Sequence, residues 1–379
     1  MKQLVFPAAL AAVLLCLPPT GSTQNTEPKN ADSKNTEPAG QPTIRDGVNA
    51  LSEADLARVL PLLRQNYLAA DKLTDTELSR ATIQGLLERI APGASILAAK
   101  PAVSSAPEAH PFRSEILPNQ VAYVRLGALD PTHLSELDNA LQKFSEPGLT
   151  EQGIKALVLD LRATPAGSEF EAAAEVCKRF CPKGKLLLTL KHPNPRAERL
   201  ITSKDEPLYN GLLAILVDRR TLGAAEVIAA ILRTHAKAMI LGQTTKGEAA
   251  EFTELPLPSG KLLRIAVGEV ALPDNVTVFP GGVKPELSVE VPQEVTDEVL
   301  KIGLEKGVKG LIEDIERLRL NEASLVAGKN PELEAYQAAQ RTHGEKPKAV
   351  PRDLVLQRAL DFISAVNVYE TKDSNAPDK

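Results

Sequence analysis

Two stretches of this chain have the form of a buried strand that breaks at a glycine-containing turn and continues as a helix. They are GIKALVLDLRATPAG, residues 153–167, and LLAILVDRRTLGAAEVIAAIL, residues 212–232. Such a turn is where an α/β protein usually places a nucleophile or an oxyanion hole. The scaffold therefore has a catalytic form, but most of the polar chemistry is missing from its turns. The turn residues are Ala166, Gly167, Leu222, Gly223 and Ala224.

Strand and helix patterns alternate along most of the chain. Near-continuous apolar strands between helices indicate a mostly parallel sheet that is covered on its faces. We therefore predict an α/β fold flanked by N-terminal and C-terminal helices. The expected strands are 121–126, 154–161, 186–190, 212–217, 238–241, 249–255 and 262–272, and the expected helices are 131–144, 169–180, 224–234, 296–320 and 353–366.

Two helices are also expected near the N-terminus. Leu56, Leu60 and Leu63 share one face of the first, and Ser52 with Asp55 form a cap region ahead of it. The second begins near Thr74, and its apolar residues also share one face. Both helices are expected to bury these faces in a structural role.

The first residues have the three parts of an export signal. Lys2 supplies the positive start, residues 4–17 an apolar run, and residues 21–23 small side chains for cleavage. The run is too short for a comfortable transmembrane span, and no later segment is apolar enough to cross a bilayer. We expect an exported protein, periplasmic or extracellular, that does not span the membrane; a short membrane anchor is the alternative.

Composition shifts suggest a division of the chain into segments. Residues 24–43 are polar and poor in apolar side chains, which predicts a flexible linker. Prolines and small residues indicate a second linker after the N-terminal helices. The expected segments are a signal peptide (1–23), a linker (24–43), a helical region (44–99), a linker (100–113), the core (114–292), a C-terminal helical region (293–370) and a disordered tail (371–379).

Charge and ligand spacing exclude several classes of function. A net charge of −5 gives no general attraction to nucleic acid. The five histidines are scattered without metal-ligand spacing, so we expect no metal site. The glycine-rich turns lack the Lys-Ser/Thr pair of a phosphate loop, and we expect no cofactor. The sequence specifies no oligomeric state.

Two cysteines remain after the export signal. Cys177 and Cys181 lie one helical turn apart at an expected helix end. In an oxidising compartment they form either a strained local disulfide or a pair of buried thiols. Both alternatives stay open at this point.

Four segments, in this order, resemble the C-terminal processing (tail-specific) serine proteases. They are NQVAYVRLGAL, ALVLDLRATPAG, LAILVDRRTLGAAEVIAAIL and FPGGVKPELSV. The resemblance implies a ClpP/crotonase-like core between residues 121 and 291. It also implies that the PDZ module of this family is missing here, since the linker over 100–113 takes its place.

The resemblance further implies positions for a Ser–Lys dyad. A serine attacks only beside a base, and a lysine serves as base only where burial lowers its pKa. Aligned without gaps, the nucleophile position falls on Gly223 and the base position on Glu248, while Glu226 of the family's Ser-Glu pair is retained. The oxyanion turn corresponds to Ala166 and Gly167.

Glycine has no side chain that could attack a carbonyl. We also expect burial of Glu248 to raise the pKa of its carboxyl group, which makes it unsuitable as the base. The resemblance therefore favours a pseudoprotease that binds or scaffolds unfolded or C-terminal protein segments.

A second register gives an alternative. Thr221 and Lys246 are 25 residues apart, the spacing of serine and lysine in the family, and would form a Thr–Lys endopeptidase acting on protein C-termini. A helix cap and an exposed lysine are the simpler interpretations of these two residues. A third possibility, a crotonase-like acyl-CoA enzyme, is disfavoured because acyl-CoA is a cytoplasmic substrate.

Other polar residues near the turns have structural explanations. Asp160 and Arg162 end a strand, and we expect them to hold the turn by an ion pair. Arg220 lies in the loop before the second turn, at the expected cleft entrance, where its guanidinium could receive a carboxylate in a forked contact. A solvated loop is the simpler interpretation of that segment.

Overall fold

The computed structural model describes residues 43–98, 109–146, 153–192, 198–312 and 351–373. The chain divides into two compact units, Met1–Glu77 and Leu78–Lys379. The expected signal peptide and nearly all of the expected first linker lie outside the described residues, as does most of the second linker. None of the helices described here combines the length and the apolarity needed to cross a membrane.

The N-terminal unit contains helices α1 (Ile44–Asn49) and α2 (Glu53–Asn66) and a 3-10 turn, η1 (Ala70–Lys72). Ser52 caps α2 as expected, because its Oγ accepts from the Asp55 amide at 3.2 Å and the Asp55 carboxylate accepts from the Ser52 amide at 3.1 Å. The expected burial of the leucine face is wrong. Leu56 and Leu60 are about half exposed, and none of the residues of α1, α2 and η1 is buried.

Helix α3 (Asp75–Ile90) begins at the boundary of the two units. The Thr74 hydroxyl accepts from the Glu77 amide at 3.2 Å, which agrees with the expected start. Its expected buried face is also wrong: Ile83 and Leu86 are exposed, and the helix has no buried residue.

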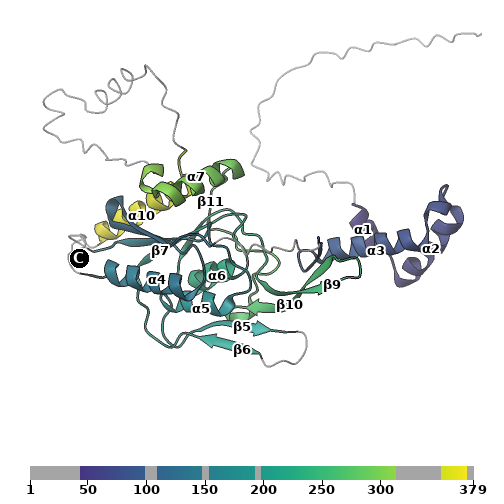
Figure 1. The fold of residues 1–379 in the computed structure, drawn as a ribbon, viewed down its shortest axis with the longest axis horizontal. Helices are drawn as coiled ribbons and strands as arrows, with labels where there is room; N and C mark the ends of the chain where they lie inside the picture. The colour runs from purple at the N-terminus through teal and green to yellow at the C-terminus, as the bar shows by residue number, and fades with distance from the viewer. Residues whose placement is uncertain (1–42, 99–108, 147–152, 193–197, 313–350, 374–379) are drawn as a thin grey trace, which may run out of the picture. The chain divides into compact units, whose positions relative to one another are not determined.

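A six-stranded sheet forms the centre of the second unit (Figure 1). All neighbouring strands of this sheet are parallel except Arg113–Leu117 and Val121–Arg125, which pair antiparallel. This mostly parallel sheet confirms the predicted α/β class. Its strands, in spatial order, are β11 (Leu287–Ser288), β8 (Met239–Gly242), β7 (Leu212–Val217), β4 (Ala156–Asp160), β3 (Val121–Arg125) and β2 (Arg113–Leu117).

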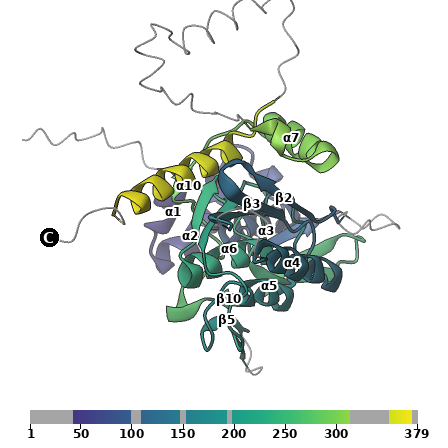
Figure 2. The ribbon, with the colours of Figure 1, turned by 90° about the vertical axis from the view of Figure 1, so that its left-hand side faces the viewer.

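Helices cover both faces of this sheet because successive side chains of each strand point to opposite sides. On one face, Leu157 and Ile215 pack with α4 (Pro131–Phe144), α5 (Phe170–Lys178) and α6 (Ala224–Ala236). On the other face, Val158 and Leu216 pack with α10 (Leu354–Asp373). Figures 1 and 2 show α10 on the opposite side of the sheet from α4 and α5, with α7 (Gln293–Lys306) near its N-terminal end.

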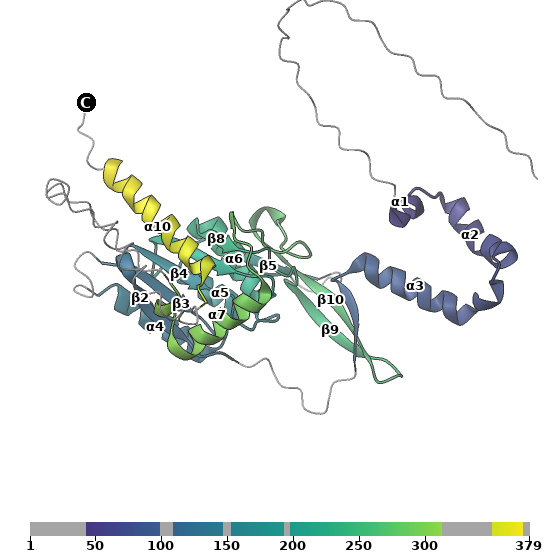
Figure 3. The same cartoon turned by 90° about the horizontal axis from the view of Figure 1, so that it is seen from above.

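A second sheet, fully antiparallel, was not expected as a separate layer. It contains β1 (Ala94–Leu97), β10 (Leu262–Ala271), β5 (Leu186–Lys191) and β6 (Arg199–Thr202), with β9 (Ala250–Pro256) also paired to β10. Figure 3 shows β9 and β10 as a long ribbon. Strands β1, β2 and β6 are missing from the sequence prediction because they are short and carry no continuous apolar run.

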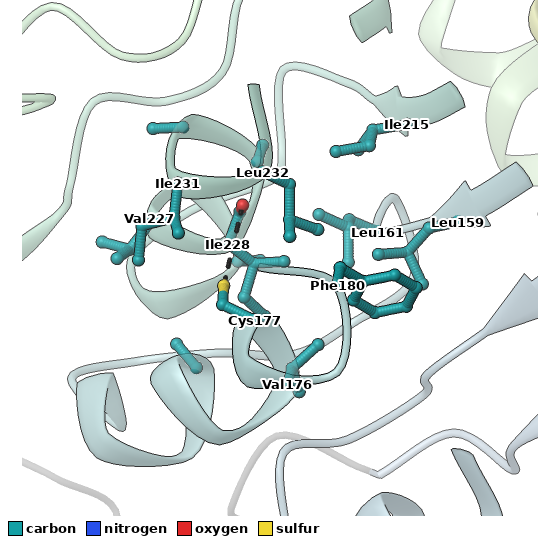
Figure 4. Packing of buried hydrophobic residues seen from close by; sticks show 14 of the residues in the cluster. Leu159, Leu161, Val176, Cys177, Phe180, Ile215, Val227, Ile228, Ile231 and Leu232 are labelled. Carbon is teal, nitrogen blue, oxygen red and sulfur yellow. Dashed lines mark hydrogen bonds between the residues drawn. The ribbon is translucent and has the colours of Figure 1, made fainter. Parts of the chain in front are cut away.

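The two cysteines are free thiols buried among α5 and α6. Figure 4 shows Cys177 beside Ile228, whose carbonyl oxygen lies 4.0 Å from the sulfur. Burial raises the pKa of Cys177 well above its usual value and that of Cys181 to about 12. Of the two alternatives for this pair, the structure therefore contains the buried thiols, and both are held in the unreactive protonated form.

A buried ionic cluster joins the sheet to α10. Arg162 donates from Nε to Asp160 Oδ1 at 2.9 Å and from Nη2 to Asp160 Oδ2 at 2.7 Å, which confirms the expected ion pair. The same guanidinium donates to both carboxylate oxygens of Asp353, at 2.9 and 2.7 Å. Burial acts to raise the pKa of Asp160, but the Arg162 charge and hydrogen bonds outweigh it and lower that pKa.

Asp353 also caps the helix that it attaches. Its Oδ1 accepts from the Leu356 amide at 3.0 Å in the first turn of α10. The charge that binds Arg162 thus also satisfies an amide that the helix itself leaves unpaired.

Replacing Asp353 should loosen α10 more than it disturbs the rest of the core. Asp353→Asn leaves the Arg162 guanidinium with one charged partner in a buried site, which costs about 3–5 kcal/mol of folding free energy. Denaturant unfolding measures the loss, and hydrogen exchange should become faster for the amides of α10.

The matched control is Glu290→Gln, which removes a carboxylate from the exposed pair with Arg219. Exposed pairs contribute about 0–1 kcal/mol. Equal losses in the two variants would contradict a structural role for the buried cluster.

Candidate functional site

The loop between β7 and α6 is held by one aspartate. Asp218 Oδ1 accepts from the amides of Arg220 and Thr221, at 3.0 and 2.9 Å, and from Thr221 Oγ1 at 3.0 Å. Thr221 Oγ1 in turn accepts from the Asp218 amide at 3.0 Å. The threonine hydroxyl is therefore engaged both as donor and as acceptor within its own loop.

Gly223, where the resemblance places the nucleophile, is the N-cap residue of α6 and has φ +58° and ψ −124°. A β-carbon at Gly223 would lie 2.2 Å from the carbonyl oxygen of Gly167, closer than real β-carbons approach any atom. The Ala224 amide donates to this same carbonyl oxygen at 2.8 Å. The turn that contains Gly167 thus occupies the space that a nucleophile side chain at Gly223 would need.

The expected oxyanion turn has its own internal partners. Glu169 Oε2 accepts from the Gly167 amide at 2.5 Å. Ala166, one residue earlier, is half-buried against the core. The amides of Gly167 and Ala224, the donors that such a turn would direct at an oxyanion, therefore both donate to groups of the protein itself.

Glu226 is fully buried in the first turn of α6. It connects the turn between β7 and α6, residues 218–223, which we call the elbow, to the loop that contains Gly247 and Glu248. Its Oε2 accepts from the amides of Gly223 and Glu248 at 2.9 and 2.8 Å. Its Oε1 accepts from the Gly247 amide at 2.6 Å and from Thr245 Oγ1 at 2.5 Å. Burial raises the pKa of Glu226, while these four hydrogen bonds act in the opposite direction. One carboxylate thereby holds Gly223 and Glu248 next to each other.

Glu248, where the resemblance places the base, lies in an ionic cluster. Its Oε1 is 2.8 Å from Lys246 Nζ, and its Oε2 accepts from Arg264 Nη2 at 3.1 Å. The Arg264 guanidinium also lies 3.5 Å from the centre of the Phe252 ring. The expected rise in the pKa of Glu248 is wrong: burial acts in that direction, but the hydrogen bond and charge of Lys246, followed by those of Arg264, lower the pKa.

Thr221 and Lys246, the alternative pair, are joined by a backbone hydrogen bond and not by one between their side chains. The Lys246 amide donates to the Thr221 carbonyl at 3.0 Å. The Thr221 hydroxyl is bound to Asp218, and the Lys246 ammonium, about half exposed, is paired with Glu248. Over the described ranges there is no hydrogen bond between Thr221 Oγ1 and Lys246 Nζ.

Sequence reasoning missed three residues that shape this site. Thr245 relays between Glu226 and the Val283 amide, which donates to its Oγ1 at 2.7 Å. Glu169 accepts a hydrogen bond from the Gly167 amide. Arg264 donates to the carboxylate of Glu248. The charge of Glu169 two residues after Gly167 was a readable signal, whereas Arg264 comes from the distant strand β10.

No group of three or more His, Cys, Asp and Glu side chains with the arrangement of a metal site occurs in the part of the chain that the structure describes.

The family model for peptidase family S41 matches residues 120–289, which contain the elbow, the oxyanion turn and the Glu248 loop. This region is a peptidase family S41 domain. The match confirms the resemblance to C-terminal processing proteases. The cluster of Arg162 with Asp353 joins the S41 domain to α10, which lies beyond the match.

Named relatives agree with this assignment. The S41 domain is similar to the chloroplastic carboxyl-terminal-processing peptidase 1 of Arabidopsis thaliana, at 26% identity over 44% of this chain and 33% of that protein. It is also similar to the carboxy-terminal processing protease CtpA of Bacillus subtilis, at 26% identity over 47% of this chain and 37% of that protein. The chain thus spans little more than a third of the length of these relatives.

Among solved structures, the chain is similar to a photosystem II D1 C-terminal processing protease. The identity is 26% and the TM-score 0.40, and the match covers 57% of this chain and 51% of that one.

Adding a side chain at Gly223 should destabilise the S41 domain. Gly223→Ala places a β-carbon against the Gly167 carbonyl and strains a positive φ. The control is Gly260→Ala in the β9–β10 turn, where φ is +79° and no atom lies within 4 Å of the added carbon. The control should cost about 1–2 kcal/mol for the left-handed backbone alone.

Gly223→Ala should cost about 1–3 kcal/mol more than the control, because the close contact adds to the backbone strain. Denaturant unfolding of both variants measures the difference. Equal costs would mean that the turn at Gly167 moves away freely and does not block this position.

Proposed function

We propose that the S41 domain is a pseudoprotease, which keeps the frame of a C-terminal processing protease without cleaving peptide bonds. The observation that carries the proposal is the contact between Gly223 and Gly167. The nucleophile position has no side chain, and a carbonyl oxygen stands 2.2 Å from where its β-carbon would be. A serine hydroxyl cannot be introduced there without movement of the oxyanion turn.

The state of the oxyanion turn supports the same conclusion. Stabilising a tetrahedral intermediate requires amide donors that are free to point at the developing charge, and one such donor contributes about 2.7–4 kcal/mol to catalysis. Here the Ala224 amide donates to Gly167 and the Gly167 amide donates to Glu169. Both hydrogen bonds would have to break before a substrate oxygen could be bound.

The contacts also disfavour the Thr221–Lys246 enzyme. A lysine acts as a general base when it is desolvated and neutral, and within hydrogen-bond reach of the nucleophile. Lys246 is about half exposed, and its Nζ lies 2.8 Å from Glu248 Oε1 and not within reach of Thr221. The Thr221 hydroxyl already donates to Asp218.

The remaining role for this frame is to bind protein chains. The relatives are named as processing proteases of protein C-termini, so we propose unfolded or C-terminal protein segments as the partners. We further propose that residues 1–23 direct export, which places the protein in the periplasm or outside the cell. N-terminal sequencing of the exported protein should give a start close to residue 24, and an intact Met1 would contradict this.

The purified protein should not hydrolyse an unfolded substrate. Wild type, Thr221→Ala and Lys246→Ala are each incubated with reduced, alkylated casein, and new termini are counted by mass spectrometry. We expect the three samples to match a sample without added protein. Cleavage by the wild type that disappears in Thr221→Ala would refute the pseudoprotease and establish the threonine enzyme.

A further inference from the structure

A pocket of about 360 Å³ lies beside the elbow and is separate from Gly223 and Glu248. Its walls come from the turn after β4, which contains Thr164, from Arg220 in the elbow loop, and from α7. Parallel α/β sheets commonly bind ligands at the carboxyl ends of their strands, where this pocket lies. We call it the Arg220 pocket.

Two cations of the pocket, Arg220 and Lys301, are exposed residues. Arg220 Nη2 lies 2.7 Å from Asp297 Oδ1, in a pair of side chains that are each about half exposed. Lys301 lines the same pocket one helical turn after Asp297. Arg162 also reaches the lining, but Asp160 and Asp353 offset its charge. Arg220 Nε also lies 3.8 Å from Oδ2 of the buried Asp218, so the pocket has no excess of positive charge, and Asp297 is the exposed partner that a ligand could replace on Arg220.

A buried hydroxyl and an apolar wall complete the lining. Thr164 is almost fully buried, and its Oγ1 has no hydrogen-bond partner among the residues that the structure describes. A buried polar group without a partner costs about 1–3 kcal/mol, so a ligand that accepts from this hydroxyl would be favoured. Leu300 and Leu304, one turn apart on α7, supply apolar surface to the same pocket.

We propose that the Arg220 pocket binds a carboxylate that carries a short apolar tail. The carboxylate takes the place of Asp297 on the Arg220 guanidinium, whose planar fork suits two oxygens, and Lys301 adds a second charge. The tail lies against Leu300 and Leu304. Two sources carry this chemistry, a free branched-chain acid and the last residue of a polypeptide.

Isothermal titration calorimetry with 4-methylpentanoate tests the pocket. We expect saturable binding of this acid, and binding at least tenfold weaker for 4-methylpentanamide, which lacks the charge, and for acetate, which lacks the tail. Arg220→Met should weaken binding of the acid at least tenfold. Asp297→Asn should tighten it several-fold, because the competing carboxylate is removed from Arg220.

The matched control is Arg219→Met. Arg219 precedes Arg220 but pairs with Glu290 and does not line the pocket, so binding should be unchanged. Absence of saturable binding, equal binding of acid and amide, or unchanged binding by Arg220→Met would overturn the proposal. The opposite effects expected of Arg220→Met and Asp297→Asn separate ligand binding from a general loss of folding.

Two peptides that end in leucine, one with a free carboxylate and one amidated, distinguish the sources. Tight binding of the free-carboxylate peptide alone identifies a chain terminus as the ligand, and binding of the small acid without the peptide identifies a free acid. 4-Methylpentanoate has no peptide bond, so its binding is independent of whether the S41 domain cleaves. Hydrolysis of casein would therefore refute the pseudoprotease and leave the pocket standing.

Discussion

The carboxylate of Glu226 fixes the geometry on which the rest of the site depends. It accepts four hydrogen bonds, three from backbone amides and one from the Thr245 hydroxyl. Burial alone would favour the neutral acid, but a proton on either oxygen would take the place of one of these donors. The elbow and the Glu248 loop therefore keep their relative position through hydrogen bonds to one buried carboxyl group.

The turn at Gly167 occupies the space beside Gly223 in which a side chain would lie. Because Gly223 carries no β-carbon, the turn at Gly167 can approach the start of α6 and accept a hydrogen bond from the Ala224 amide. This bond satisfies a helix amide that would otherwise be unpaired. The absence of a side chain at Gly223 and the hydrogen bond of the Ala224 amide to Gly167 are thus linked in the structure. Restoring a hydroxyl at Gly223 would require the reversal of both.

The sequence predicted the elements that local patterns determine. The helix α4 was expected with the bounds that it has, Pro131–Phe144. Strand β7 was likewise expected with the bounds that it has, from a continuous apolar run. The short strands β1 and β6 were missed since their stability comes from partners far along the chain. The leucine face of α2 followed the pattern of a buried helix and is nevertheless exposed.

At the site, too, contacts between residues far apart in the chain were not predicted. The expected pair of Asp160 and Arg162 is two residues apart and was predictable, whereas Asp353 reaches Arg162 from 191 residues away. For Glu248 the expected pKa shift had the wrong direction, because burial was foreseen but the hydrogen bond and charge of Lys246, and those of Arg264 from β10, were not. The resemblance gave expected positions for the site residues, but the charges around Glu248 include that of Arg264 from the distant strand β10.

Two arginines near the carboxyl ends of β4 and β7, Arg162 and Arg220, differ in how their charged partners are buried. Arg162 has both edges of its guanidinium occupied by buried carboxylates, so its charge serves to attach α10. Arg220, on the adjacent loop, has only an exposed partner in Asp297 and a more distant one in Asp218, at 3.8 Å. An exposed pair is weak and can be exchanged for a ligand at little cost, whereas a buried bidentate pair cannot. Binding at this edge of the sheet therefore depends on Arg220.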